Sequence, residues 1–133
     1  MPTLVAGFGC RQGCPAEALG ALLDQTLRAH GLQHMPLAAI ASLDRKADEP
    51  GLLQLAAQRG VPLCTFSAAH LAAQEPYLSH RSQTSFAHTG CQGVAESSAL
   101  ALAQALGDAR PRLLVERQHC AQATLALCQV GVT

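Results

Sequence analysis

The stretch VAGFGCRQGCP, residues 5–15, decides the fold class of this chain. Its apolar start completes a run, residues 3–8, that reads as a short buried strand. Glycines interrupt the run, and Pro15 suits the first position of the helix that follows. Leucines then recur at helical spacing up to Gly31, which is a typical helix stop. A strand, a glycine-rich loop and a helix in this order indicate the first unit of an α/β domain.

The remaining chain repeats this alternation. The predicted elements are strands at 37–43 and 61–66, helices ending at Gly60, over 68–73 and within 93–107, and two apolar runs at 112–117 and 123–130. Asp48 is a candidate cap of the second helix, and Ser67 of the third. Five residues join the last two runs, which predicts an antiparallel hairpin. The sequence therefore predicts a three-layer α/β/α fold, with helices on both faces of a mostly parallel sheet of about five strands ending in that hairpin.

Length and charge limit the kinds of protein that this sequence can encode. The 133 residues, 49% of them apolar, predict one domain spanning residues 1–133. The formal net charge is zero, which argues against a nucleic-acid partner, because nucleic-acid binding depends on neutralising phosphates. No signal-peptide pattern and no long apolar stretch occur, so we expect a cytoplasmic protein with no membrane partner. A local cluster of donors could still bind a small anion.

The six cysteines and six histidines show no spacing typical of a metal site. Cys10 and Cys14 form C-x-x-x-C, which differs from the C-x-x-C of zinc ribbons. We therefore predict no metal and no cofactor, and free thiols throughout. Cys10 and Cys14 are expected in an exposed loop, where they would oxidise first. The sequence also contains no G-x-S-x-G nucleophile elbow.

Three loops carry the candidate chemistry, and each precedes a helix. The first, residues 9–15, offers the backbone N–H groups of Gly9, Cys10 and Gly13 and the guanidinium of Arg11. Glycines let a ligand approach the backbone closely, and a helix N-terminus adds a partial positive charge. This combination predicts a site for a phosphate or carboxylate. The alternative is that the glycines only form a tight turn.

The second loop, residues 44–49, places Lys46 and Glu49 just before a helix. Because the carboxyl ends of neighbouring parallel strands meet at one edge, we expect this loop to converge with the first. Lys46 could instead pair with Asp44, Asp48 or Glu49 on the surface, which is the common fate of mixed charges.

The third loop, residues 86–94, also places glycines before a helix. Gly90 and Gly93 precede a helix that carries Glu96 in its first turn. Glu96 could simply complement the helix dipole. Glu49 and Glu96 are the glutamates beside candidate ligand loops, so they are the best acid–base candidates. The predicted ligand-binding set is Gly9, Cys10, Arg11, Gly13, Lys46, Glu49, Gly90, Gly93 and Glu96.

Two further features leave alternatives open. Gly7-x-Gly9-x-x-x-Gly13 is a near match to the dinucleotide fingerprint, with Asp44 where a ribose-binding acid belongs, so nucleotide binding is a second hypothesis. Residues 74–92 are polar and have no clear period. We expect the part from 76 to 90 to be mobile and to order over a ligand, with contacts from His80, Arg81 and His88.

Four motifs together resemble one known family. GFGCRQG near the start, DRKADEPGLLQLA after the second strand, GCQGVAESSAL at the last long helix and TLALCQV near the end are similar to the CobE/CbiG C-terminal domain family. The resemblance covers nearly the whole chain and implies a stand-alone, CobE-like member. It implies a role in cobalamin (vitamin B12) biosynthesis, with a precorrin-type tetrapyrrole as ligand and other enzymes of that pathway as candidate partners.

The family resemblance leaves the question of catalysis open. The larger CbiG proteins hydrolyse a lactone and release a two-carbon fragment, so a role as an enzyme on the same intermediate is the alternative to a binding role. Corrin precursors carry acetate and propionate carboxylates around an apolar macrocycle. Helix N-termini with Arg11 and Lys46 nearby would suit such a rim, and the loop 9–15 would hold one of its carboxylates.

Overall fold

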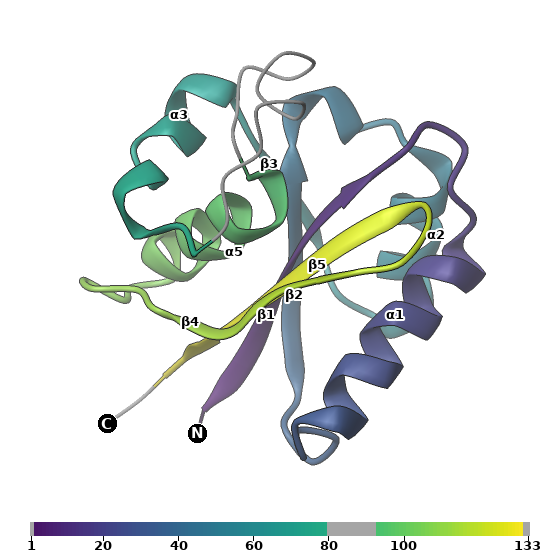
Figure 1. Cartoon of the computed structure of the whole chain (residues 1–133), viewed down its shortest axis with the longest axis horizontal. Coiled ribbons are helices and arrows are strands. Elements are labelled where there is room, and N and C mark those ends of the chain that lie inside the picture. The colour runs from purple at the N-terminus through teal and green to yellow at the C-terminus, as the bar shows by residue number, and fades with distance from the viewer. Residues whose placement is uncertain (1, 80–92, 132–133) are drawn as a thin grey trace.

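The structure is a computed structural model that describes residues 2–79 and 93–131 (Figure 1). The strands are β1 (Thr3–Cys10), β2 (Leu37–Leu43), β3 (Leu63–Phe66), β4 (Leu113–His119) and β5 (Ala123–Val130). The helices are α1 (Ala16–Ala29), α2 (Pro50–Arg59), α3 (Ala68–Ala72) and α5 (Val94–Ala105), with short 3-10 helices η1 (Asp44–Lys46) and η2 (Glu75–Tyr77). The predicted order of strands and helices is confirmed.

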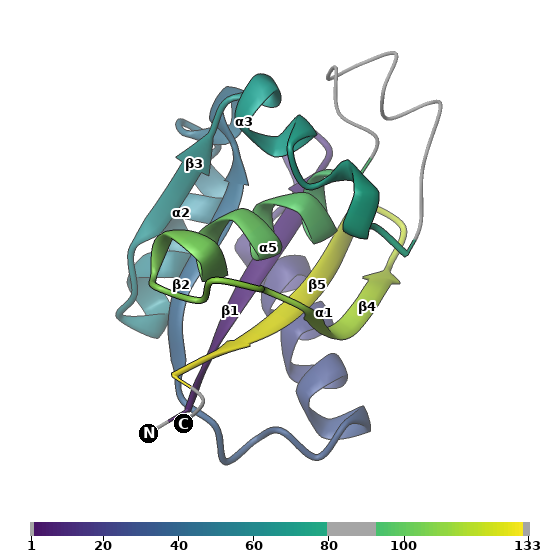
Figure 2. The same ribbon diagram turned by 90° about the vertical axis from the view of Figure 1, so that its left-hand side faces the viewer.

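The five strands form one sheet in the order β3-β2-β1-β5-β4. β1, β2 and β3 are parallel, whereas β5 is antiparallel to both of its neighbours. β4 therefore runs in the same direction as the first three strands, and β5 alone is reversed. The predicted mostly parallel sheet with a terminal hairpin is confirmed. Helices α1 and α2 cover one face, while α3 and α5 cover the other (Figures 1 and 2).

The two faces of the sheet are packed in different ways. On the α1/α2 face, large side chains fill the core, among them Phe8 of β1, Leu19 of α1 and Leu52 of α2. On the other face, α5 presents mainly alanines and serines and comes very close to β1. A Cβ atom at Gly7 would lie 2.1 Å from the backbone oxygen of Ala95 in α5. Gly7 of the opening motif therefore serves helix–sheet packing.

Several local predictions need correction. β1 continues to Cys10, two residues beyond the predicted end, and β3 begins at Leu63. Asp48 does not cap α2, because Glu49 occupies the N-cap position and no side chain makes a capping bond. The Ser67 cap is confirmed, since its Oγ accepts a 3.0 Å hydrogen bond from the backbone N–H of His70.

The predicted polar loop 74–92 is only partly described. Its first residues contain η2, and Gln74 is buried and donates from Nε2 to Oε1 of Gln104 over 2.8 Å. Residues 80–92, with the predicted contacts His80, Arg81 and His88, lie outside the described residues. None of the described helices is long and apolar enough to cross a lipid bilayer.

Candidate functional site

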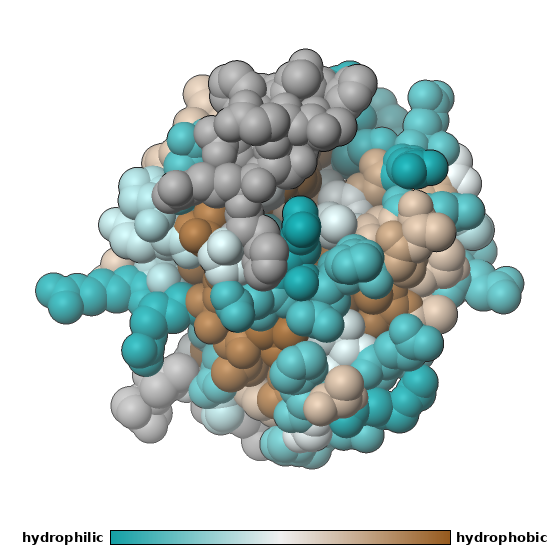
Figure 3. All heavy atoms as spheres, viewed as in Figure 1, coloured by the Kyte–Doolittle hydropathy of each residue, from teal (hydrophilic) through white to brown (hydrophobic). Residues whose placement is uncertain are grey.

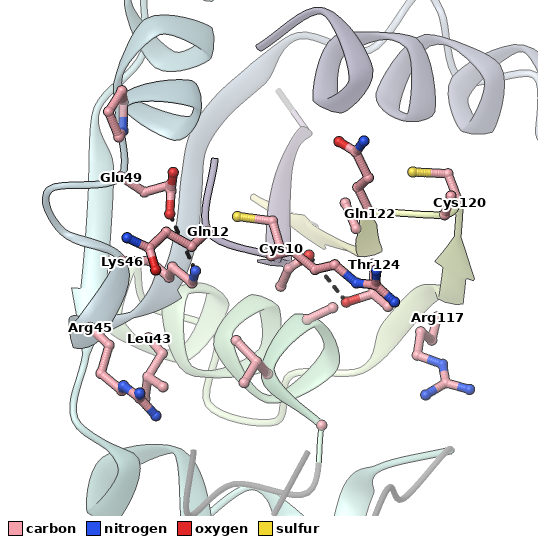
Figure 4. Close-up of a pocket in the computed structure, with 18 of the residues that line it drawn as sticks. Cys10, Gln12, Leu43, Arg45, Lys46, Glu49, Arg117, Cys120, Gln122 and Thr124 are labelled. Carbon is pink, nitrogen blue, oxygen red and sulfur yellow. Dashed lines mark hydrogen bonds and ion pairs between the residues drawn. The ribbon is translucent and has the colours of Figure 1, made fainter. Parts of the chain in front are cut away.

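Strand direction brings four chain segments to one edge of the sheet. Because β1, β2 and β4 point the same way, their carboxyl ends lie at the same edge as the start of β5. A cavity of about 930 Å³ opens there, with walls drawn from residues 9–12, 43–50, 93–95 and 117–124 (Figure 4). This is the edge at which open α/β sheets commonly bind their ligands. The expected convergence of the first two loops is therefore observed.

The loop after β1 forms the first wall. Its backbone is anchored at both ends, because the N–H of Arg11 donates to the carbonyl of Gln122 over 2.9 Å and the N–H of Cys14 donates to the carbonyl of Arg11 over 3.1 Å. Gly51 at the start of α2 lets this loop pack closely, since a Cβ there would lie 2.1 Å from the carbonyl oxygen of Cys14. The side chain of Arg11 stays exposed at the rim of the cavity.

The loop after β2 forms the second wall, and Glu49 ties it to the first. One carboxylate oxygen of Glu49, Oε2, accepts a 3.0 Å hydrogen bond from the backbone N–H of Gly13. The other, Oε1, accepts one from Nζ of Lys46 at 3.2 Å (Figure 4). The Glu49 side chain is only 5% exposed, against 21% for Lys46. Of the partners considered for Lys46, the structure selects Glu49.

The floor of the cavity is made of small residues. Gly9 lies at the end of β1, where a Cβ atom would come within 2.8 Å of Oγ1 of Thr124 and 3.5 Å of Cβ of Val94. Val94 and Ala95 open helix α5, whose N-cap Gly93 has no side-chain capping bond. No side chain among the described residues caps the first backbone N–H groups of α5, and the start of this helix favours a negative charge nearby.

The third wall, which the sequence prediction missed, comes from β4 and the turn into β5. It contributes Arg117, Cys120 and Gln122 (Figure 4). With these residues in place, the cavity has four cationic side chains against two anionic ones: Arg11, Arg45, Lys46 and Arg117 against Asp48 and Glu49. The excess of cations makes the cavity suited to an anionic ligand.

With this geometry established, comparisons with known proteins identify the chain's relatives. The model of the family "Cobalamin synthesis G C-terminus" matches residues 4–128. The chain belongs to this family. Protein CobE of Sinorhizobium sp is 40% identical over 125 residues, which are 93% of this chain and 78% of that protein. The crystal structure of CobE, a protein from the cobalamin biosynthetic pathway, matches with a TM-score of 0.92 and 44% identity, over 99% of this chain and 93% of that one.

A second group of relatives within the cobalamin family consists of much larger proteins. The cobalt-precorrin-5A hydrolase of Salmonella typhimurium is 46% identical over 68 residues, which are 51% of this chain and 19% of the hydrolase. The chain thus spans about a fifth of that relative. Taken together, the matches show that this is a CobE-like protein of cobalamin biosynthesis.

The structure brings most of the predicted ligand-binding residues of this CobE-like protein to one cavity. Those that line it are Gly9, Cys10, Arg11, Lys46, Glu49 and Gly93. Gly13 and Glu96 do not line it, and Gly90 lies outside the described residues. Asp44, on which the nucleotide hypothesis depended, does not line it either. The residues that sequence reasoning missed are mainly Arg45, Arg117 and the β4–β5 turn.

Glu96 has a structural position in this CobE-like fold. It is 1% exposed, and its Oε2 accepts a 2.9 Å hydrogen bond from the backbone N–H of Arg117. Its Oε1 accepts another from the backbone N–H of Ser79 at 2.9 Å, and the Ser79 hydroxyl also donates to its Oε2. The carboxylate therefore ties α5 to β4 and to the segment after η2. An acid–base role in the cavity does not fit this placement.

The Cys10 thiol of the site is a poor nucleophile. Cys10 lines the cavity, and burial raises the pKa of its thiol to about 11, although the nearby Lys46 ammonium acts in the opposite direction. Cys10 belongs to β1 and Cys14 is buried, so the expectation that both lie in an exposed loop was wrong. The described cysteines are all free, namely Cys10, Cys14, Cys64, Cys120 and Cys128; Cys91 lies outside the described residues.

Metal ligands do not gather in the part of the chain that the structure describes. Within residues 2–79 and 93–131, no three His, Cys, Asp or Glu side chains are arranged to hold a metal ion. Among the same residues, the cavity offers four cationic side chains, the carboxylates of Asp48 and Glu49, and the start of helix α5.

Proposed function

We propose that the cavity binds an anionic corrin precursor of the precorrin type and holds or delivers it during cobalamin biosynthesis. The observation that carries this proposal is the excess of cationic side chains around a floor of small residues. A corrin precursor has the matching chemistry, with carboxylates on an apolar macrocycle. The cavity volume of about 930 Å³ falls within the usual range of small-molecule sites.

A ligand that is both apolar and charged needs apolar and polar side chains on the protein surface. On the face shown in Figure 1, patches of hydrophobic side chains lie between hydrophilic ones (Figure 3). The cations Arg11 and Lys46 would contact carboxylates on the rim of the ring, and the N-terminus of α5 would add a favourable dipole. The ring itself would lie against Gly9, Val94 and Thr124.

Absorption titration tests this proposal, because corrins absorb visible light. The probe is a corrin that carries free acetate and propionate carboxylates, and the control is the same corrin with every carboxylate converted to its methyl ester. We expect saturable binding of the acid and at least tenfold weaker binding of the ester, since each charge-assisted hydrogen bond is worth about 1.5–3 kcal/mol. Equal affinity for the two, or no binding of the acid, would contradict the proposal.

A catalytic role is the second candidate, and the identity to a cobalt-precorrin-5A hydrolase favours it. Its acid or base in the cavity would be Glu49. That carboxylate is engaged by both Gly13 and Lys46, so it would have to release one partner to accept a proton. Incubation of the protein with the lactone-containing intermediate, followed by analysis of the product, decides between the two roles. An opened lactone made by the wild type and lost in Glu49→Gln would support the hydrolase.

A further inference from the structure

Arg117 differs from the other cations of the cavity. Its Nε–H is buried and has no hydrogen-bond partner among the described residues. Lys46, by contrast, donates to Glu49. A buried donor without an acceptor costs about 1–3 kcal/mol, so in native proteins such a donor is normally satisfied by a water molecule, an ion or another hydrogen-bonding group. The side chain of Arg117 nevertheless borders the cavity.

A hydrogen bond from the backbone of Arg117 to a buried carboxylate fixes the position of this residue. Its backbone N–H donates to the buried carboxylate of Glu96, which belongs to the first turn of α5. A buried carboxylate is costly to desolvate unless it is well hydrogen-bonded. Here the Glu96 carboxylate holds strand β4 at Arg117, whose guanidinium borders the cavity. Glu96 is therefore a positioning residue for Arg117.

Arg117 also lies on the opposite side of the cavity from Arg45 and Lys46. Figure 4 shows these two residues on the wall formed by the loop after β2, and Arg117 on the wall formed by β4, with Cys10 and Thr124 between them. A single carboxylate that binds Lys46 on one wall leaves Arg117 free to bind another. A planar guanidinium suits a carboxylate in particular, since it can donate two parallel hydrogen bonds.

We propose that Arg117 is the second anion anchor of the cavity and that the ligand spans it with carboxylates at two opposite edges. This inference rests on the proposed function and narrows it to polycarboxylates of macrocycle size. A ligand carboxylate would pair with the guanidinium of Arg117, whose Nε–H has no hydrogen-bond partner among the described residues. A ligand with its carboxylates gathered on one edge would use only one of the two walls.

The test compares Arg117→Gln with a matched control, Arg112→Gln. Arg112 lies just before β4 and borders a separate small hollow, so its loss changes the net charge equally without touching the cavity. The probe is the corrin with free carboxylates, measured by absorption titration. We expect Arg117→Gln to weaken binding tenfold to a hundredfold, and Arg112→Gln to change it less than twofold.

A second pair of variants tests the two-wall arrangement and guards against misfolding. Arg117→Lys keeps the charge but not the planar fork, so a folded Arg117→Lys protein is expected to bind at least threefold more weakly than the wild type. In the double variant Lys46→Gln/Arg117→Gln the two losses should multiply, because groups that contact different carboxylates act independently.

The outcomes separate this inference from the proposed function. If the wild type binds the corrin and both Arg117→Gln and Arg117→Lys bind it with the affinity of the wild type, the role of Arg117 is overturned. The proposed function is then left standing. If the double variant bound the corrin as well as the weaker-binding of the two single variants, the role of Arg117 as a second anchor would also be overturned, since both cations would then hold one carboxylate. Wild-type protein that fails to bind would remove the proposed function, and this inference with it.

Discussion

The ion pair between Lys46 and Glu49 should stabilise the fold as well as shape the site. Glu49 bridges the loops after β1 and β2, with Gly13 on one oxygen and Lys46 on the other. The change to make is Lys46→Met, which keeps the length of the side chain and removes the charge. It leaves one oxygen of a carboxylate that is 5% exposed without its partner.

The size of the effect follows from the burial of the two partners. An exposed ion pair contributes up to about 1 kcal/mol, whereas breaking a buried pair costs about 3–5 kcal/mol. Because Lys46 is 21% exposed, water can partly replace it, so we expect a loss of about 2 kcal/mol in the free energy of unfolding. For a chain of this length, that corresponds to a melting temperature lower by roughly 8 °C.

Urea unfolding of a double-mutant cycle measures this effect. The cycle consists of the wild type, Lys46→Met, Glu49→Gln and the double variant, which should lose about 1–2 kcal/mol less than the two single losses added together. The control is Arg59→Met, because Arg59 pairs with Asp24 at a more exposed position, with the two side chains 30% and 45% exposed. The Arg59→Met variant should lose less than about 1 kcal/mol in the free energy of unfolding. A Lys46→Met variant as stable as Arg59→Met, with no coupling to Glu49, would refute the reasoning.

Three further predictions concern other parts of the molecule. Gly7→Ala should lower the free energy of unfolding by about 3 kcal/mol or more in urea, because its Cβ would overlap the carbonyl oxygen of Ala95; unchanged unfolding would contradict the packing. Iodoacetamide at pH 7.5 should label exposed Cys120 well before Cys10. Burial raises the pKa of the Cys10 thiol to about 11, so its thiolate fraction grows only as the pH approaches that value. Equal labelling of the two cysteines in mass spectra would argue against this order of reactivity. Arg11→Ala should weaken binding of the carboxylate corrin about tenfold at low salt and less at high salt, with an unchanged melting temperature; an equal loss at both salt concentrations would exclude a screened charge contact.

The local sequence predicted the fold well, because each element carries its own signal. Leucines at helical spacing, Gly60 with a positive φ of 68° at the end of α2, and the cap at Ser67 all act within a few residues. The prediction that Asp48 caps α2 was wrong for an equally local reason. Pro50 takes the first position of α2, which makes Glu49 rather than Asp48 the N-cap residue.

The site was only partly predictable, because its second half depends on the order of the strands. Gly9, Arg11 and Lys46 follow β1 and β2, which are neighbours in both sequence and space. Arg117 reaches the same edge only because β5 pairs with β1 and turns β4 back into the parallel direction. The hairpin was predicted from its two apolar runs, but nothing local indicated which strand it would pair with.

The roles of single residues were harder still to predict, because they depend on contacts distant in sequence. Gly7 looked like part of a ligand loop, yet its neighbour is Ala95, on a helix near the other end of the chain. Glu96 looked like an acid–base candidate beside a loop, yet it is buried against the backbone of Arg117. Both residues support the site through packing and hydrogen bonding.

The most direct test of the central claim, that an anionic corrin binds at the carboxyl edge of the sheet, is a map of the binding site by NMR. Backbone amide shifts of labelled protein would be followed while the corrin with free carboxylates is added. We predict that the largest changes fall in residues 9–13, 44–49, 93–95 and 117–124, and that residues 111–113 near the separate hollow stay unchanged. Among residues 2–75 and 93–131, changes centred outside these four segments would contradict the account, as would equally large changes with the methyl ester.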